Sequence, residues 1–160
     1  MKEIKLTTTI KVYEDVSELS PADQTLLQRA HDAVHDSYSP YSNFKVGAAI
    51  RLGNGKILGG SNQENASYPL CLCAERTALS AAASLYPKEE ITAIAVTAKS
   101  PTKPITFPIS PCGACRQVIC ETENKHKHDI RIILQGETGE IYEFMTAKDL
   151  MPLSFDAEFL

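Results

Sequence analysis

Three features are missing from this sequence of 160 residues: a long apolar run, an apolar block behind the N-terminal charges, and a cluster of basic residues. A transmembrane helix needs about 20 consecutive apolar residues, so we do not expect a membrane-spanning protein. The N-terminal stretch "MKEIKLTTTIKVY" has no apolar core of the kind found in secretory signal peptides, and we expect a cytoplasmic protein. Nucleic-acid-binding proteins usually present a basic face, and the net charge of −4 argues against long nucleic acids and anionic membranes as partners.

The pattern of apolar residues predicts one layered α/β domain behind an N-terminal arm. Residues 1–19 begin with alternating apolar and polar side chains, which predicts an extended arm that either adds an edge strand or braces a subunit contact. A helix is expected to begin at Ser20 and Pro21, because serine caps helices and proline favours their first position. Residues 20–160 then form a single domain.

Five strands are expected in this domain. Asn54-Gly55 between two apolar runs predicts a hairpin, and the near-continuous apolar run 91–99 predicts a strand covered on both faces. Two more strands are expected over 130–136 and 140–145, and two more helices over 73–86 and 112–124. Strands that alternate with helices after an initial hairpin indicate a mixed sheet in an α/β fold.

The cysteines form two tight clusters, at positions 71 and 73 and at positions 112, 115 and 120. Disulfides are rare in a reducing compartment, where spaced cysteines more often bind metal or take part in catalysis. Cys112 and Cys115 form a C-x-x-C turn, in which Gly113 would ease the tight backbone. With Cys73 they make three ligands, which leaves a zinc ion one position for water, and Glu75 stands close enough in sequence to take a proton from that water.

Cysteine spacing alone leaves other interpretations open. Cys71 as a fourth thiolate would close the site and make it structural. The C-x-x-C pair could instead be redox-active. The cysteines could also be ordinary core residues, because free cysteine is among the most buried residue types.

Order and neighbourhood favour the catalytic interpretation. A C-x-E followed by P-C-x-x-C matches the zinc deaminase signature in its three-cysteine form. Four motifs carry the match, "SPYSNFKVGAA", "NQENASYP", "CAERTAL" and "SPCGACRQV". Together they resemble the small homotetrameric cytidine deaminases of pyrimidine-nucleoside salvage, over most of the chain from Ser37 to Phe155. The resemblance implies a three-layer α/β/α sandwich and zinc-dependent hydrolysis of cytidine and 2′-deoxycytidine to uridine and 2′-deoxyuridine plus ammonia.

The same resemblance implies roles for the residues around the metal. Cys73, Cys112 and Cys115 hold one zinc ion per subunit, and zinc-bound hydroxide attacks the amino-bearing ring carbon. Glu75 carries protons from the water to the ring nitrogen and then to the departing amino group. Arg76 hydrogen-bonds the ligand sulfurs and offsets the charge of three thiolates.

Further residues are implied to bind the substrate. Asn62 and Glu64 match the pair that binds the ribose 3′-hydroxyl, and a carboxylate there favours a nucleoside over a phosphorylated substrate. Phe44 packs near the nucleoside, the backbone of Ala74 contacts the base, and Phe155 reaches the base in a neighbouring subunit. The implied partners are therefore a nucleoside and further copies of the chain in a homotetramer whose active sites neighbouring subunits complete, with no nucleic acid or membrane. Cys71 packs beside the site without binding metal, and Cys120 lies in the core.

Three rival functions stay open at this level. The first is a deaminase of the same fold with another substrate, such as the nucleoside antibiotic blasticidin S, against which "NQENASYP" argues. The second is nucleic-acid editing, which the negative charge disfavours. The third is a non-catalytic module with a closed four-cysteine zinc site. The sequence does not distinguish a preference for ribose from one for deoxyribose.

Overall fold

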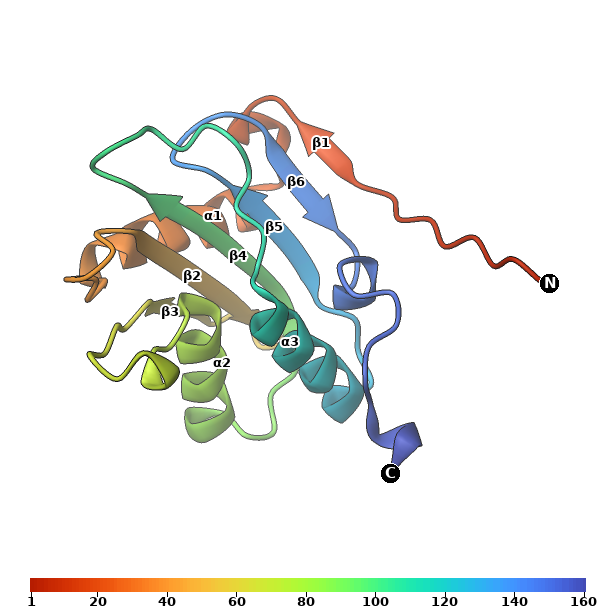
Figure 1. Cartoon of the computed structure of the whole chain (residues 1–160). Helices are drawn as coiled ribbons and strands as arrows, with labels where there is room; N and C mark the ends of the chain where they lie inside the picture. The colour runs from red at the N-terminus through yellow and green to blue at the C-terminus, as the bar shows by residue number, and fades with distance from the viewer.

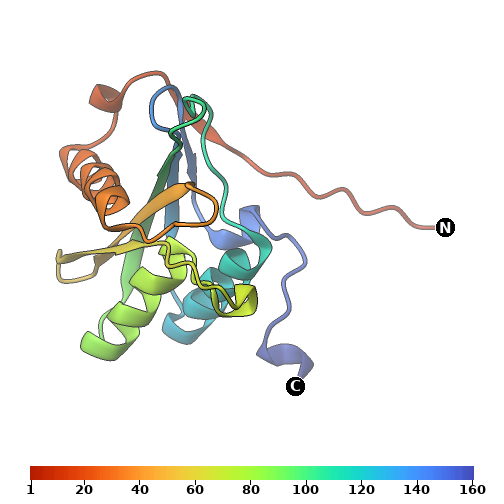
Figure 2. The ribbon, with the colours of Figure 1, turned by 60° about the vertical axis from the view of Figure 1, so that its left-hand side comes forward.

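The computed structural model describes residues 1–160 and contains one sheet with helices on both faces (Figures 1 and 2). The strands are β1 (Lys11–Tyr13), β2 (Lys45–Leu52), β3 (Ile57–Ser61), β4 (Ile91–Lys99), β5 (Arg131–Gln135) and β6 (Ile141–Phe144). The helices are α1 (Pro21–Ala33), α2 (Ala74–Leu85) and α3 (Gly113–His126). None of the helices is both long and apolar enough to cross a membrane.

The sheet is mixed, as predicted, with the strand order β1-β6-β5-β4-β2-β3. Only β4 and β5 run parallel, and every other neighbouring pair is antiparallel. Helix α1 covers one face and helices α2 and α3 cover the other, which confirms the three-layer α/β/α sandwich (Figure 2).

The sheet has six strands, one more than predicted. The additional strand, β1, comes from the N-terminal arm and pairs antiparallel with β6, with Lys11 opposite Glu143. The hydroxyl of Tyr13 also donates a hydrogen bond to the Glu143 carboxylate (2.6 Å). The alternation in the arm predicts an extended chain, but its partner strand lies near the other end of the sequence, so no local pattern reveals the pairing.

Local signals in the sequence place the other elements correctly. Helix α1 starts at Pro21, and the Ser20 hydroxyl caps it by accepting a hydrogen bond from the backbone N–H of Asp23 (3.2 Å). The β2–β3 hairpin turns through Gly55, which has a φ of +84° that a side chain would disfavour.

Strand β4 contributes to the core on both faces of the sheet. Ile94 and Val96 pack on the side of α2 and α3, whereas Ala93 and Ala95 pack on the side of α1. Helix α2 comes especially close to the sheet at Gly60, where an added Cβ atom would lie 2.7 Å from the carbonyl oxygen of Ala74. The absence of a side chain at this position therefore fixes where α2 begins.

The loop that joins β4 to α3 is held at its middle by the β5–β6 turn. The carbonyl oxygen of Ile105 accepts a hydrogen bond from the backbone N–H of Glu137 (2.6 Å). A Cβ atom on Gly136 would collide with this carbonyl group. Phe107 packs edge-on against Tyr142, with ring centroids 5.5 Å apart. These contacts fix the path of the loop that leads to the second cysteine cluster.

A buried charged cluster joins α1 to the far strands of the sheet. Arg131 donates hydrogen bonds to Asp23 (2.7 Å) and to Glu143 (2.7 Å), and Arg51 donates to Asp23 (2.9 Å). Burial by itself would raise the pKa of Asp23, but hydrogen bonds from Arg131 and Ser20 hold that pKa below its ordinary value. Pairing of this kind compensates the cost of burying the carboxylates.

Candidate active site

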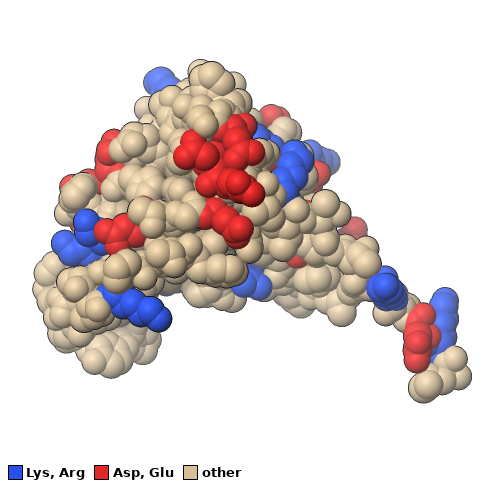
Figure 3. Space-filling model, turned by 90° about the horizontal axis from the view of Figure 1, so that it is seen from above, with Lys and Arg blue, Asp and Glu red and all other residues tan.

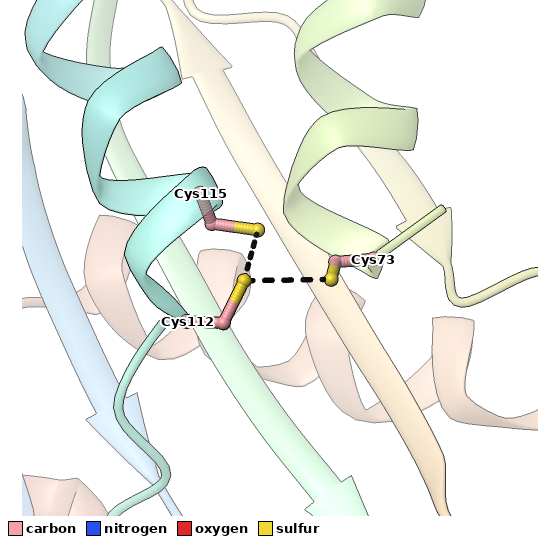
Figure 4. Close-up of side chains that lie close together, drawn as sticks. All are labelled: Cys73, Cys112 and Cys115. Carbon is pink, nitrogen blue, oxygen red and sulfur yellow. Dashed lines mark hydrogen bonds between the residues drawn. The ribbon is translucent and has the colours of Figure 1, made fainter. Parts of the chain in front are cut away.

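Three cysteines meet where helices α2 and α3 begin (Figure 4). Cys73 is the N-cap of α2 and Cys112 is the N-cap of α3, both with extended backbone, and Cys115 lies in the first turn of α3. The Sγ atom of Cys112 lies 3.7 Å from that of Cys73 and 3.5 Å from that of Cys115. The position of Cys73 at the entrance of the helix is what turns its side chain toward the other two.

These thiols have the spacing that a zinc ion requires. Tetrahedral Zn–S bonds of about 2.3 Å place ligand sulfurs roughly 3.8 Å apart, and all three Sγ atoms lie within 4.8 Å of one another. The guanidinium of Arg76 gives a second observation. Its Nη2 atom donates to the carbonyl oxygen of Cys71 (2.7 Å), whereas its Nε atom is buried without a partner. A negatively charged thiolate–metal group beside it would supply the missing acceptor, so the residues fit zinc.

The electrostatics of the cluster favour a thiolate at Cys73. Hydrogen bonding from Cys115 and Cys112, together with the positive charge of Arg76, lowers the pKa of Cys73 to about 5. The pKa of Cys115 moves upward, because its thiol hydrogen-bonds to Cys73 and is buried. The N-terminal ends of α2 and α3 add positive potential at the same place.

Glu75 is the carboxylate of this site. It lies in the first turn of α2 with only 4% of its surface exposed. Burial raises the pKa of Glu75, and the negative charge of Cys73 raises it further. A buried acid beside a potential metal site is the arrangement expected of a group that exchanges protons with a bound substrate.

The remaining cysteines lie outside the cluster. Only Cys73, Cys112 and Cys115 come together as possible ligands, whereas Cys71 turns away and its Sγ atom accepts a hydrogen bond from the backbone N–H of Asn65 (3.2 Å). The closed four-cysteine arrangement is therefore not formed. Cys120 is fully buried in the core, as expected.

The interpretation of Gly113 was wrong. This residue has no left-handed φ, and an added Cβ atom would meet nothing within 4 Å. The C-x-x-C turn gets its shape from its place at the start of α3, so it does not depend on the conformational freedom of glycine.

Asn62 and Glu64 hold the loop that precedes β2. The Oδ1 atom of Asn62 accepts hydrogen bonds from Val46 N–H (2.8 Å) and from the Ser37 hydroxyl (2.6 Å). The carboxylate of Glu64 accepts from the hydroxyl and the backbone N–H of Ser42, and these bonds lower the pKa of Glu64. Both side chains are half-buried, and Glu64 stays ionised as an acceptor.

The aromatic candidates occupy two different environments. Phe44 is half-buried and lines a hollow of about 370 Å³ whose other wall is the loop 103–109. Phe155 is 58% exposed and stacks on Phe159, with ring centroids 5.7 Å apart. Ala74 is fully buried at the first position of α2, directly after Cys73.

Sequence reasoning assigned no role to Arg116, which organises the second cysteine cluster. Its guanidinium donates to the carbonyl oxygen of Pro111 (2.9 Å), to the Ser110 hydroxyl (2.6 Å) and to the carbonyl oxygen of Leu150 (2.9 Å). A signal was present in "SPCGACRQV", since a long cation directly after a ligand parallels Arg76 directly after Glu75.

Comparison with known proteins agrees with this site. A family model described as the cytidine and deoxycytidylate deaminase zinc-binding region matches residues 20–127, which include all three clustered cysteines. A cytidine deaminase of Halalkalibacterium halodurans is 42% identical over 135 residues, which cover 84% of this chain and 95% of the relative. A cytidine deaminase of Sporosarcina psychrophila is 39% identical over 135 residues, covering 84% of this chain and 92% of the relative.

A solved structure agrees as well. The crystal structure of cytidine deaminase from Burkholderia pseudomallei matches with a TM-score of 0.71 and 45% sequence identity, covering 82% of this chain and 97% of that chain. The prediction of zinc as the metal is confirmed by the zinc-binding family model together with the cluster of three thiols. The family model, the relatives and the fold agree, and the chain belongs to the cytidine deaminase family.

Proposed function

We propose that this chain catalyses the hydrolytic deamination of cytidine and 2′-deoxycytidine to uridine and 2′-deoxyuridine, with release of ammonia, in pyrimidine salvage. The observation that carries the proposal is the convergence of the Cys73, Cys112 and Cys115 sulfurs within 4.8 Å at the starts of two helices, with Glu75 buried in the same first turn. The cytidine deaminases among its relatives support the choice of base.

In this proposal the three thiolates hold one zinc ion per subunit. Zinc bound by three protein ligands supplies a water molecule that is acidic enough to provide a nucleophile at neutral pH. Three thiolates carry more negative charge than the ion neutralises. Arg76 and the N-terminal ends of α2 and α3 offset that charge, because each presents positive potential to the sulfurs.

Glu75 is the proton shuttle in this proposal. Its carboxylate takes a proton during attack on the amino-bearing ring carbon, holds it away from bulk water and delivers it to the adjacent ring nitrogen. A second transfer protonates the amino group, which leaves as ammonia. The burial of Glu75 supports the role, because a shuttle that exchanged with solvent would lose the proton between the two transfers.

Asn62 and Glu64 bind the ribose 3′-hydroxyl in this proposal. A carboxylate accepts a hydrogen bond from a free hydroxyl group and repels a phosphate, which favours a nucleoside over a nucleotide. The loop contacts of Glu64 support a fixed acceptor, since hydrogen bonds from Ser42 hold it in place. Phe44 packs beside the nucleoside and the backbone of Ala74 contacts the base.

The proposal extends to assembly and location. Residues 20–160 form the catalytic domain, residues 1–19 are an arm outside it, and four copies associate in the cytoplasm. Phe155 reaches the base in a neighbouring subunit. Its exposure supports this role, because an aromatic side chain this exposed has surface left to bury against another copy.

A time course of cytidine absorbance with zinc-loaded protein tests the activity. The spectrum is expected to change to that of uridine. Glu75→Gln is expected to abolish turnover while zinc stays bound, whereas the exposed Glu121→Gln serves as a matched control and keeps the activity. An unchanged spectrum from folded, zinc-loaded protein would refute the proposed substrate, and full activity in Glu75→Gln would refute the proposed shuttle.

A further inference from the structure

The N-terminal arm, defined here as residues 1–10, takes no part in the site described above. Figures 1 and 2 both show it leaving the body of the molecule as an extended chain. Residues 1–10 belong to no helix or strand, and none of the backbone hydrogen bonds in turns and loops involves them. One side-chain hydrogen bond ties the arm down, from the hydroxyl of Thr8 to the carbonyl oxygen of Asp149 (2.9 Å).

The arm presents an uncovered apolar face. Side chains alternate in an extended chain, so every second residue lies on the same side. The apolar residues on that side are Ile4 (78% exposed), Leu6 (55%), Ile10 (43%) and Val12 (50%). Strand β1 continues the arm, stands at the end of the sheet order and pairs only with β6. Its outer edge therefore has unpaired backbone donors and acceptors, which commonly attract another strand.

The charges point to another copy of the chain as that partner. Residues 1–12 contain three lysines and one glutamate, a net charge of +2, so the rest of the chain carries −6. Figure 3 shows acidic side chains gathered on the face seen from above, with the arm projecting away from them. A hollow of about 480 Å³ at this end of the sheet is lined by Glu14, Asp15 and Glu137. Two bodies of net charge −6 would therefore be drawn together by their basic arms.

We propose that the arms of two copies of this chain pair as antiparallel strands about a two-fold axis at Thr7. In this register Ile4 stands opposite Ile10 of the other copy, Leu6 stands opposite Thr8, and Glu3 stands opposite Lys11. Apolar pairs then share one face of the ribbon and opposite charges share the other, which are the combinations that stabilise antiparallel strands. The pairing is the same from either copy, as a two-fold contact requires.

Pairing supplies what the isolated arm lacks. The backbone groups of residues 1–10 gain partners, and the sheets of the two copies join through their β1 edges. The bond from Thr8 to Asp149 aims the arm before it meets its partner, which reduces the ordering that association requires.

Sedimentation velocity over a range of protein concentrations tests the proposal on the full zinc-loaded chain. Deletion of residues 1–9 and the substitution Leu6→Asp are each expected to raise the concentration needed for association by at least about tenfold. Thr9→Asp introduces the same charge on the opposite face, across from Lys5, and is expected to associate as the full chain does. Glu3→Lys sets a lysine opposite Lys11 and is expected to weaken association.

Unchanged association after deletion of residues 1–9, or in Leu6→Asp, would overturn the proposal. An equal loss in Leu6→Asp and Thr9→Asp would also overturn it, since the contact would then not depend on the apolar face. Tight association in Glu3→Lys would overturn the register. The measurement does not depend on the proposed activity: association without cytidine turnover counts against the function alone, and turnover without arm-dependent association counts against this contact alone.

Discussion

The Nε atom of Arg116 donates a hydrogen bond to the carbonyl oxygen of Pro111 (2.9 Å), the residue directly before Cys112. Arg116 itself directly follows Cys115, so one guanidinium group joins the backbone on both sides of the C-x-x-C turn. The same side chain reaches Leu150 (2.9 Å), at the start of the segment that carries Phe155. Arg116 is therefore a positioning residue for the cysteine pair.

We expect Arg116→Lys to weaken zinc binding. An ammonium group cannot make all three hydrogen bonds of the guanidinium, and loss of two of them should lower the free energy of unfolding by about 2 kcal/mol. Zinc affinity, measured by competition with a chromophoric chelator, should fall by roughly tenfold or more. Arg29→Lys, on α1 at the other face of the sheet, is the matched control. Equal zinc affinity in the two variants would contradict the assignment.

We expect Gly136→Ala to disturb the loop that leads to Cys112. The new Cβ atom would collide with the carbonyl group of Ile105, and the hydrogen bond from Glu137 to that carbonyl would stretch or break. Overpacking of this kind should destabilise the protein by roughly 1–3 kcal/mol, measurable by thermal unfolding. Gly53→Ala is the comparison, because its Cβ atom would lie 3.9 Å from the nearest heavy atom. Similar melting temperatures for the two variants would show that the loop tolerates the displacement.

We expect Cys71→Ala to keep both zinc and activity. The Cys71 thiol lies outside the metal cluster, and the contact with Arg76 uses the backbone carbonyl, which alanine retains. Metal analysis of the purified variant should give one zinc per subunit, and cytidine turnover should match that of the unmodified protein. Loss of zinc would instead revive the four-thiolate site.

We expect acid to weaken the contact between α1 and the far strands. Although burial would raise it, hydrogen bonds from Tyr13 and Arg131 hold the pKa of Glu143 below its ordinary value, and the pKa of Asp23 is held low in the same way. Both carboxylates therefore contribute stability that is fully present above their unfolded pKa values of about 4. That contribution is lost as the pH falls through the lower folded-state values.

Urea unfolding between pH 7 and pH 3 checks this expectation. Glu143→Gln removes one charge of the cluster and should cost roughly 3 kcal/mol at pH 7, while the remaining stability should depend less on pH below 5. Acid also protonates the metal-binding thiolates, but that effect is common to both proteins and cancels in the comparison. Asp32→Asn, at an exposed position of α1, should follow the unmodified protein throughout. Parallel pH curves for all three proteins would exclude a role for the cluster.

The sequence predicts those parts of the fold whose causes are local. Ser20 and Pro21 start a helix, and Asn54 and Gly55 turn a hairpin, through backbone preferences that act over a few residues. Nothing local indicates that β1 pairs with β6. The same limit applies to the site, because spacing groups Cys112 with Cys115, while only the family resemblance joins them to Cys73.

Side chains that act through the backbone were the hardest to predict. Arg116 was quoted within a motif without a role, because its partners are carbonyl oxygens that carry no sequence signature. Asn62 and Glu64 were matched to the substrate, yet in the folded chain they also hold the loop before β2. A role for Phe155 needs the surface of a second subunit, which the sequence of one chain cannot place.

The two helix starts that carry the thiols lie far apart along the chain, with Cys73 and Cys112 separated by 39 positions. A metal held between them closes this stretch into a ring, and the ring contains β4, the strand that contributes to both faces of the core. Such a cross-link restricts the unfolded chain in the way a disulfide does. The metal site is therefore also a thermodynamic tie across the centre of the sheet, and the free zinc concentration sets part of the folding equilibrium.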